Sequence, residues 1–366
     1  MSAPKVIVST CGTSLLTYQV AQELRKLINQ YANNSESTIP QEAKSKLQQR
    51  LAEQKTVLEE ANLATASKMS AELNGIISYY NNELSQGKRG DQHYLIVSDT
   101  FLGKEVGKAI QVWLEKQGLN TALHETPGLV ANDLDNFRSA MSDLIQWCEE
   151  ALKPWGKENV IFNLTGGFKG TQGFMQTLGM FYAEESVYIF EGSSLLRIPR
   201  LPVRLDTDQV ILDNADAFRQ LGNGQDLEQT MVSGIPETLL TVMEGRALLS
   251  PWGDLIWEQG KHHLYQSELL EPLANLRFAE GFEKEVKKQN LTSDQLSMLN
   301  RRLDQLHLVV RDPSKNVKGL DFKSLVGNPR PPSTHECDIW SGDERRLFGH
   351  FEEDIFVIDS IARGLH

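Results

Sequence analysis

Two short segments, far apart in the chain, contain the residue types that bind phosphate. Their sequences are Ser9-Thr10-Cys11-Gly12-Thr13-Ser14 and Asn163-Leu164-Thr165-Gly166-Gly167-Phe168-Lys169-Gly170. Each follows a short apolar run and leads into a stretch with helical spacing. A strand-to-helix turn of this kind exposes backbone N–H groups at the positive end of the helix dipole, where anions bind. With the Lys169 ammonium and the hydroxyls of Thr13, Ser14 and Thr165, the two segments predict a site for a nucleotide-like ligand.

The residue order excludes two common nucleotide motifs. The second segment reads Lys-Gly-Thr rather than Gly-Lys-Thr, so it is not a P-loop, and the first lacks the G-x-G-x-x-G that dinucleotides need. Asp99 and Thr100 follow a third predicted strand and are expected at the same site. Because a carboxylate repels phosphate, we expect Asp99 to cap a helix or to contact an adenine or ribose. A plainer interpretation makes Thr13 and Ser14 helix caps and Lys169 a solvated lysine.

The first 204 residues alternate predicted strands and helices. Strands are expected at 5–9, 94–98, 121–124, 160–163 and 187–190, with helices at 103–115 and 133–152 between them. Such alternation predicts a Rossmann-like α/β domain with a mostly parallel, doubly wound sheet. Ligands bind such sheets at the carboxyl ends of the strands, where all three polar segments lie.

Residues 40–85 interrupt this alternation. The segment is rich in Gln, Glu, Lys, Ala and Leu, and its apolar residues have helical spacing. We expect two helices that form a projecting hairpin, docked on the sheet or on a partner chain. A plain surface insertion is the alternative.

Residues 205–275 form a second predicted domain, after Pro199 and Pro202 end the first. The pattern is helical and compact, and Pro251 is expected to break a helix. The segment is interpreted either as a small winged-helix domain or as a structural spacer. Its weak basic character makes duplex DNA an improbable partner.

Residues 276–366 form a third predicted domain of α+β class. We expect a strand at 276–278, helices at 281–289 and 293–308, and three antiparallel strands at 335–340, 345–351 and 355–360. This segment carries about as many basic as acidic residues, whereas the remaining chain holds nearly all of the acidic excess. That distribution suits a domain that meets RNA.

The overall composition restricts the class of protein. The 366 residues carry a net charge of -12, which gives no general attraction to nucleic acid or to acidic membranes. The three cysteines have no zinc-site or disulfide spacing. No segment has the length and apolarity of a membrane span or the pattern of a signal peptide. We therefore expect a cytoplasmic protein without a metal site or a membrane partner.

Residues 1–204 resemble the CARF family, the sensor domains of CRISPR-associated proteins. The resemblance rests on the two phosphate-like segments and on the exit from Glu191-Gly192 to Pro199-Arg200-Leu201-Pro202. It implies a homodimer that binds a cyclic oligoadenylate across its two-fold axis, and cyclic tetra-adenylate has the matching symmetry. The expected ligand-binding residues are Cys11, Gly12, Thr13, Ser14, Asp99, Thr100, Thr165, Gly166, Gly167, Phe168 and Lys169. Some CARF proteins also cut their ligand, for which Ser14 and Lys169 would position a ribose 2′-OH.

Residues 276–366 resemble RelE-type toxins, which are endonucleases that cleave mRNA on the ribosome. The resemblance rests on residues 278–288, on Arg345-Arg346-Leu347-Phe348-Gly349-His350 and on Ser360-Ile361-Ala362-Arg363. The strand that carries lysines in many RelE toxins reads His335-Glu336-Cys337-Asp338 here. Fusions of the two domain types are CRISPR-associated mRNA interferases, and the whole chain resembles one.

Metal-free RNA cleavage needs a base for the ribose 2′-OH, cations beside the phosphate and an acid for the leaving oxygen. Arg345, Arg346 and Arg363 are the candidates for the phosphate, with Arg346 the best fit to the family pattern. His350 and His335 are the candidates for proton transfer, with His366 as a further one. Arg346 and His350 share a strand face if no bulge intervenes. The alternative is that the arginines form surface ion pairs and the histidines only pack.

These expectations combine into one hypothesis. Cyclic oligoadenylate binding to the CARF dimer activates the RelE-like domain, which cleaves ribosome-bound mRNA by attack of a 2′-OH on the adjacent phosphate. No other cofactor is expected. The alternatives are a CARF transcriptional regulator acting through residues 205–275 and a stand-alone ring nuclease. Ring size, codon preference and the identities of the acid and base stay open.

Overall fold

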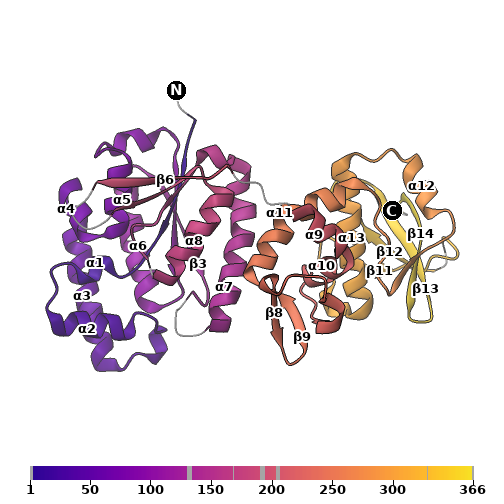
Figure 1. Cartoon of the computed structure of the whole chain (residues 1–366), viewed down its shortest axis with the longest axis horizontal. Coiled ribbons are helices and arrows are strands. Elements are labelled where there is room, and N and C mark those ends of the chain that lie inside the picture. The colour runs from indigo at the N-terminus through magenta and orange to yellow at the C-terminus, as the bar shows by residue number, and fades with distance from the viewer. Residues whose placement is uncertain are drawn as a thin grey trace. The chain divides into compact units, whose positions relative to one another are not determined.

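The computed structural model describes residues 3–129, 134–167, 169–189, 194–202, 207–327 and 329–364. The chain divides into two compact units, Met1–Arg204 and Leu205–His366 (Figure 1). The boundary between them coincides with the predicted end of the first domain. None of the described helices combines the length and the apolar composition that crossing a bilayer requires.

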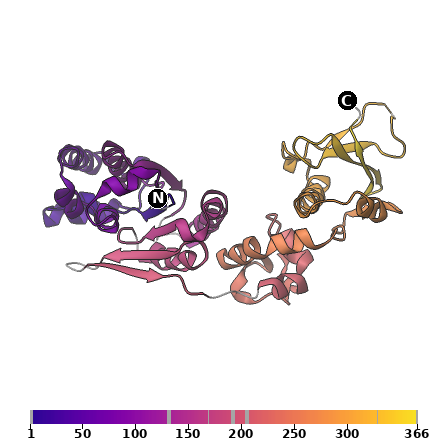
Figure 2. The same cartoon turned by 90° about the horizontal axis from the view of Figure 1, so that it is seen from above.

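A six-stranded sheet organises the first unit. Its strands are β1 (Val6–Thr10), β2 (Gln92–Ser98), β3 (Asn120–Thr126), β4 (Val160–Asn163), β5 (Glu185–Ile189) and β6 (Leu195–Pro199). Their order is β3-β2-β1-β4-β5-β6, with β1 to β5 parallel and β6 antiparallel at the edge. In Figure 2 the last two strands, β5 and β6, lie side by side in pink. The predicted parallel strands are confirmed. Because the strand order reverses between β1 and β4, the ends of these two strands mark the topological switch point of the sheet.

Helices cover both faces of this sheet, as a doubly wound fold requires. They include α6 (Phe101–Lys116), α7 (Leu134–Trp147, continued by a π-helical turn at Cys148–Leu152) and α8 (Lys169–Tyr182). On β2, Leu95 and Val97 point into a hydrophobic cluster shared with α6. Tyr94, on the opposite face, contacts Trp147 of α7 with 5.2 Å between ring centroids.

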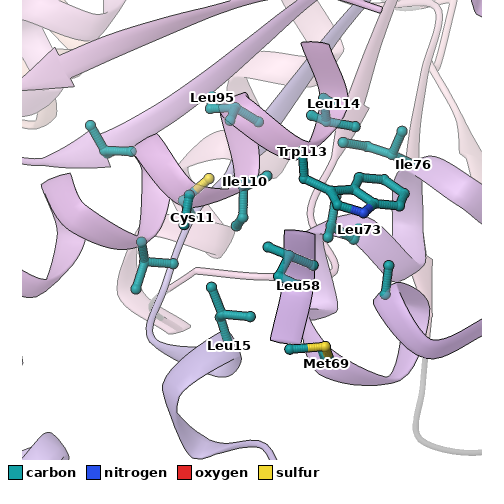
Figure 3. Packing of buried hydrophobic residues seen from close by; sticks show 14 of the residues in the cluster. Cys11, Leu15, Leu58, Met69, Leu73, Ile76, Leu95, Ile110, Trp113 and Leu114 are labelled. Carbon is teal, nitrogen blue, oxygen red and sulfur yellow. The ribbon is translucent and has the colours of Figure 1, made fainter. Parts of the chain in front are cut away.

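The connection from β1 to β2 differs from its prediction. It contains α1 (Ser14–Thr17), α2 (Gln22–Tyr31), α3 (Gln41–Glu59), α4 (Leu63–Met69) and α5 (Ala71–Tyr79). The prediction of two helices that project at residues 40–85 is wrong, because three helices form there and α3, α4 and α5 all contribute to the core. The predicted docking of this segment on the sheet is confirmed, since these helices share one buried cluster with β1, β2 and β4. Figure 3 shows Leu73 beside Trp113 of α6, with Leu58 and Met69 in the same hydrophobic cluster. Their apolar faces cover a sheet face that would otherwise meet water.

The first part of the second unit contains three helices and a small sheet. These are α9 (Thr207–Asp213), α10 (Ala215–Leu221), α11 (Pro251–Ser267), β7 (Leu227–Glu228), β8 (Leu240–Met243) and β9 (Arg246–Leu249). The strands are antiparallel in the order β7-β9-β8. The prediction that Pro251 breaks a helix is wrong, because Pro251 begins α11, where its missing N–H is not needed. The Ser250 hydroxyl caps that helix by accepting from the Gly253 N–H at 3.2 Å. The winged-helix interpretation stays a prediction.

The last part contains the two predicted helices and a five-stranded sheet, in which four strands were predicted. Its elements are β10 (Leu276–Phe278), α12 (Phe282–Lys288), α13 (Ser293–Arg311), β11 (Lys323–Ser324), β12 (His335–Asp338), β13 (Arg345–Glu352) and β14 (Ile355–Arg363). The order is β10-β14-β13-β12-β11, antiparallel except for β10 beside β14. The short strand β11 was not predicted. Residues of α12 and α13 pack on one face of this sheet, around Leu347 and Ile358.

Buried polar contacts join these two parts of the second unit. Arg219 of α10 forms an ion pair with Asp304 of α13, and Asn300 of α13 bonds to the backbone of Tyr265, Glu268 and Leu270. Residues 205–275 and 276–366 therefore belong to one compact unit. Their separation into two domains stays a prediction.

Short 3-10 turns complete the described structure. They lie at Glu36–Thr38, Leu84–Arg89, Lys153–Trp155, Lys157–Asn159, Gln229–Val232, Glu237–Leu239 and Pro313–Lys315.

Candidate functional site

The two predicted phosphate segments meet at the switch point. A Cβ on Gly12, after β1, would lie 3.2 Å from the backbone nitrogen of Gly167, after β4. Gly167 has a φ of +94°, and a Cβ there would lie 2.8 Å from the Thr10 hydroxyl oxygen. Only glycines let these turns approach so closely. The Thr10 hydroxyl donates to the Gly166 carbonyl at 2.6 Å and ties the turns together.

Two side chains hold the second turn in place ahead of α8. The amide nitrogen of Asn163 donates to the Ser9 hydroxyl at 3.1 Å and to the Glu72 carbonyl at 3.0 Å. Gln172 donates to the carbonyls of Leu164 and Gly166 at 3.0 and 3.1 Å. α8 has 14 residues, so its amino end carries a substantial partial positive charge next to this turn.

The first turn contains a carboxylate that the sequence reasoning missed. Glu72 of α5 is fully buried, and its Oε1 accepts from the Gly12 N–H at 2.7 Å. Its Oε2 accepts from the hydroxyls of Ser14 and Ser70, both at 2.6 Å. The Glu72 carboxylate thus accepts the hydrogen bond from the Gly12 N–H, which the sequence predicts to bind phosphate. No local signal predicts this, because Ser70 and Glu72 together resemble an ordinary helix start.

The first turn does not have the partial positive charge of a long helix behind it. α1 has only four residues, and the Thr13 side chain makes no capping hydrogen bond. Cys11 lies in the hydrophobic cluster, and its N–H donates to the Ile96 carbonyl at 2.9 Å. Burial, together with the nearby Glu72 carboxylate, raises the pKa of the Cys11 thiol well above its ordinary value. Cys11 therefore contributes packing to this turn.

The remaining predicted ligand residues lie in several environments. Thr100 caps α6 by accepting from the Gly103 N–H at 3.1 Å, so the cap is Thr100 and not Asp99. Asp99 accepts from the Gly128 N–H at 3.2 Å. The Thr165 hydroxyl oxygen is buried and has no hydrogen-bond partner among the described residues. Phe168, the Lys169 side chain and the Glu191-Gly192 pair lie outside what the structure describes.

Asp99 also lines a cavity of about 900 Å³ beside α3 and α6. Four lysines surround it, and each forms an ion pair with a glutamate at 2.7 to 3.0 Å; they are Lys44, Lys55, Lys104 and Lys108. Lys55 and Lys108 share Glu105, so three glutamates together with Asp99 offset the four ammonium groups, and the cavity is polar without a strong net positive charge.

In the second unit, Arg346 and His350 lie on the same face of β13. The pairing of β13 with β14 shifts between Phe348 and Gly349, where Asp359 is the additional residue on β14. The bulge is therefore on β14, and β13 keeps its alternation. Leu347 points toward the helices, so the face with Arg346 and His350 is the one opposite to them.

Carboxylates of β12 hold the Arg346 guanidinium. Its Nη1 lies 3.2 Å from Glu336 Oε1 and 2.9 Å from Asp338 Oδ1, with Asp321 4.0 Å away. Asp338 and Arg346 are directly opposite in the strand pairing. In the sequence these acidic residues show only a departure from the family pattern, because their pairing with Arg346 depends on strand register.

His350 lies between two carboxylates. Its Nδ1 is 3.0 Å from both Asp359 oxygens and its Nε2 is 3.3 Å from Glu352 Oε1. The hydrogen bond to Asp359 raises the pKa of His350. The Ser333 hydroxyl donates to Asp359 at 2.7 Å and orients that carboxylate. A protonated imidazole of this kind is suited to act as a general acid.

The other predicted catalytic residues are engaged elsewhere. Arg345 pairs with Asp343 at 2.7 Å and lies over the Trp340 ring, with 4.4 Å from its guanidinium carbon to the ring centroid. Arg363 is paired with Glu344. Arg345 and Arg363 are opposite each other in the strand pairing, on the face away from Arg346. The three guanidinium groups therefore do not lie on one face of the sheet.

His335 is also on the face away from Arg346. Its ring stacks on Phe322 with 5.1 Å between centroids, and its nitrogens contact the hydroxyls of Ser324 and Thr334 at 3.0 and 2.9 Å. Burial lowers the pKa of His335. His366 lies outside the described residues. Where the structure describes the chain, no three acidic, histidine or cysteine side chains are grouped to hold a metal ion.

Residues 67–201 match the family model of a CRISPR-associated protein, Cas_APE2256. The match supports a CRISPR-associated protein. It begins within α4, includes Glu72 and the turn after β4, and ends after β6. The turn after β1 and the whole second unit lie outside it. A comparison with curated proteins found no match.

Proposed function

We propose that this chain is a ligand-activated ribonuclease of a type III CRISPR system. A cyclic oligoadenylate would bind the first unit of a homodimer, and the second unit would then cleave mRNA on the ribosome. The observation that carries the proposal is the meeting of the Gly12 and Gly167 turns at the β1/β4 switch point, where doubly wound sheets bind ligands. The similarity of residues 67–201 to a CRISPR-associated family supports the same reading.

The turn after β4 is the better phosphate site of the two. The amino end of α8, the Gly167 backbone and the predicted Lys169 ammonium supply positive charge there. Among the described residues, no carboxylate accepts a hydrogen bond from the N–H groups of this turn, although Glu72 packs against Gly166. The buried Thr165 hydroxyl, which lacks a partner among the described residues, adds a hydrogen-bonding group. Cyclic tetra-adenylate is the preferred ligand, because its symmetry matches that of a two-fold dimer.

The face of β12 and β13 opposite to the helices carries the groups for metal-free RNA cleavage. A carboxylate would take the proton from the ribose 2′-OH, which attacks the adjacent phosphorus. Arg346 would stabilise the charge on the phosphate, and the His350 imidazolium would protonate the leaving 5′-oxygen. Asp338, with 37% of its side chain exposed, is more accessible to RNA than Glu336, at 2%. We therefore assign the base to Asp338.

Activation requires that the ligand bind one arrangement of the dimer more tightly than another. Buried contacts tie residues 205–275 to residues 276–366, so a displacement of the helical part would carry the catalytic face with it. This physical connection supports an activation mechanism. The free-energy difference between the two dimer arrangements would come from the tighter binding of the ligand to one of them.

The test uses the full chain with translating ribosomes, labelled mRNA and cyclic tetra-adenylate. We expect mRNA cleavage only with the ligand. Arg346→Ala should reduce the rate by about 100-fold, the usual loss for one group that stabilises transition-state charge. Arg345→Ala should retain cleavage, because Arg345 is held by Asp343 and Trp340 on the other face.

Arg246→Ala is the matched control, since Arg246 is a half-exposed arginine of β9 that pairs with Asp226 and Glu228. Intact mRNA in the presence of ligand would contradict the proposal. Equal cleavage by the native chain and Arg346→Ala would contradict the assigned face.

A further inference from the structure

We propose that Glu72 is a specificity-determining residue, which makes the turn after β1 an acceptor of hydrogen bonds from the ligand rather than a phosphate site. The inference rests on the proposed function for its ligand, a ribonucleotide ring. It assigns a role to a buried carboxylate that the mechanism above does not use.

The hydrogen bonds of Ser14 carry the argument. A serine hydroxyl has one hydrogen to donate and two lone pairs that accept. The Ser14 hydrogen goes to Glu72 Oε2 at 2.6 Å, and one lone pair accepts from the Ala71 N–H at 3.0 Å. One lone pair remains, and Ser14 is only half-buried. Toward a ligand, the Ser14 hydroxyl therefore accepts a hydrogen bond and cannot donate one.

The neighbouring donors are used in the same way. The Gly12 N–H and the Ser70 hydroxyl both donate to Glu72, at 2.7 and 2.6 Å. All three groups that hold the carboxylate are neutral, so its negative charge is not cancelled by them. Phosphate oxygens are acceptors with negative charge and would be repelled here. A hydroxyl or amine hydrogen would be attracted.

Glu72 is fixed in this position by close packing. A Cβ on Gly166 would lie 2.2 Å from Glu72 Oε1, so the second turn closes over the carboxylate. Displacing Glu72 would disturb both turns together. The ligand therefore meets the first turn with the carboxylate in place.

The ligand group that fits is a hydrogen-bond donor to Ser14. A ribonucleotide ring offers two such donors, the 2′-hydroxyl of a ribose and the exocyclic amine of adenine. Calorimetry with the full chain distinguishes them through three rings: cyclic tetra-adenylate, its 2′-deoxy analogue and the inosine ring, which lacks the amine. For the native chain we expect one analogue to bind about 10-fold more weakly, the loss that corresponds to one hydrogen bond. The analogue that weakens identifies the source.

Glu72→Gln tests the role of the carboxylate with little change of shape. Its amide oxygen still accepts from Gly12, and its NH₂ donates to Ser14, which frees the Ser14 hydrogen. The 10-fold preference should then fall to nearly equal affinities. Ser70→Ala is the control, because it removes a donor to the same carboxylate oxygen and leaves the Ser14 hydroxyl donating to Glu72. It should keep the 10-fold preference, and thermal unfolding verifies that both variants fold.

The outcomes separate this inference from the proposed function. Equal binding of all three rings by the native chain would overturn the role of Glu72 and leave the proposed function intact. A full preference retained in a folded Glu72→Gln variant does the same. If no ring binds, the proposed function fails and this inference fails with it.

Discussion

Arg219 and Asp304 form a buried ion pair between α10 and α13, with 2.7 Å between Nη2 and Oδ1. Their side chains are 2% and 1% exposed. Tyr265 of α11 donates to the other carboxylate oxygen at 2.6 Å, so three helices meet at one acidic group. This cluster links the helical part of the second unit to its α+β part.

Removing one partner of this pair should strongly destabilise the second unit. We expect Asp304→Ala to lower the free energy of unfolding by about 3 kcal/mol, because it leaves a buried guanidinium without its carboxylate. Urea unfolding measures the change. Asp216→Ala is the control, since Asp216 pairs with the same arginine at 3.1 Å but is 74% exposed. It should cost less than about 1 kcal/mol, and equal costs for the two variants would disprove the role of burial.

Gly166 and Gly173 should respond in opposite directions to alanine. A Cβ on Gly166 would collide with the Glu72 carboxylate, which three hydrogen bonds hold in place, so Gly166→Ala should destabilise by about 1–3 kcal/mol. A Cβ on Gly173, on the exposed side of α8, meets nothing within 4 Å. Gly173→Ala should therefore stabilise the protein by about 0.5–1 kcal/mol. Melting temperatures of both variants check this, and a similar loss in each would refute the collision.

Burial of His93 should make stability fall in acid. His93 is fully buried beside the Tyr80 hydroxyl, 3.1 Å away, and burial lowers its pKa from 6.5 to about 3. The unfolded chain binds this proton below pH 6.5 and the folded chain does not. Stability is therefore complete above pH 6.5 and declines as the pH falls toward 3, by up to about 1.4 kcal/mol per pH unit.

His93→Gln should flatten this decline. Urea unfolding at several pH values between 7 and 4 compares the two slopes. The carboxylates that lose stability in acid are the same in both proteins, so the difference reports His93. Identical slopes would show that His93 does not contribute.

Asp359 should set the titration of His350. Its hydrogen bond raises the pKa of His350, so the folded chain holds this proton more tightly than the unfolded chain. The resulting stability is complete below the ordinary pKa and is lost as the pH rises through the raised one. NMR titration of the imidazole should show a lower pKa in Asp359→Asn. Ser333→Ala, which removes another donor to Asp359, should leave the pKa raised; a lowered value there would point to general loosening instead.

Local patterns were sufficient to predict the parallel strands of the first unit and several helices and strands of the last part of the chain. Apolar runs that end in small polar residues identified the parallel strands of the first unit, and the spacing of apolar residues identified α6, α13 and the final antiparallel strands. The alternation of apolar and polar residues and the preferences of turn residues act over a few positions, so they can be recognised in the sequence directly. The placement of the turns after β1 and β4 at one edge of the sheet followed from the same pattern.

Tertiary structure decided which groups meet in those places. Glu72 reaches Gly12 only because α5 packs on the sheet, and Arg346 meets Asp338 only because β12 and β13 pair in one register. Such contacts depend on packing over the whole unit, and helix spacing alone could not distinguish a core segment from a projecting one at residues 40–85. The sequence by itself determined the strands, the turns and the types of polar group at the candidate sites. Only the fold decided that a carboxylate occupies the first turn, because hydrogen bonds between distant residues form wherever packing brings donor and acceptor together.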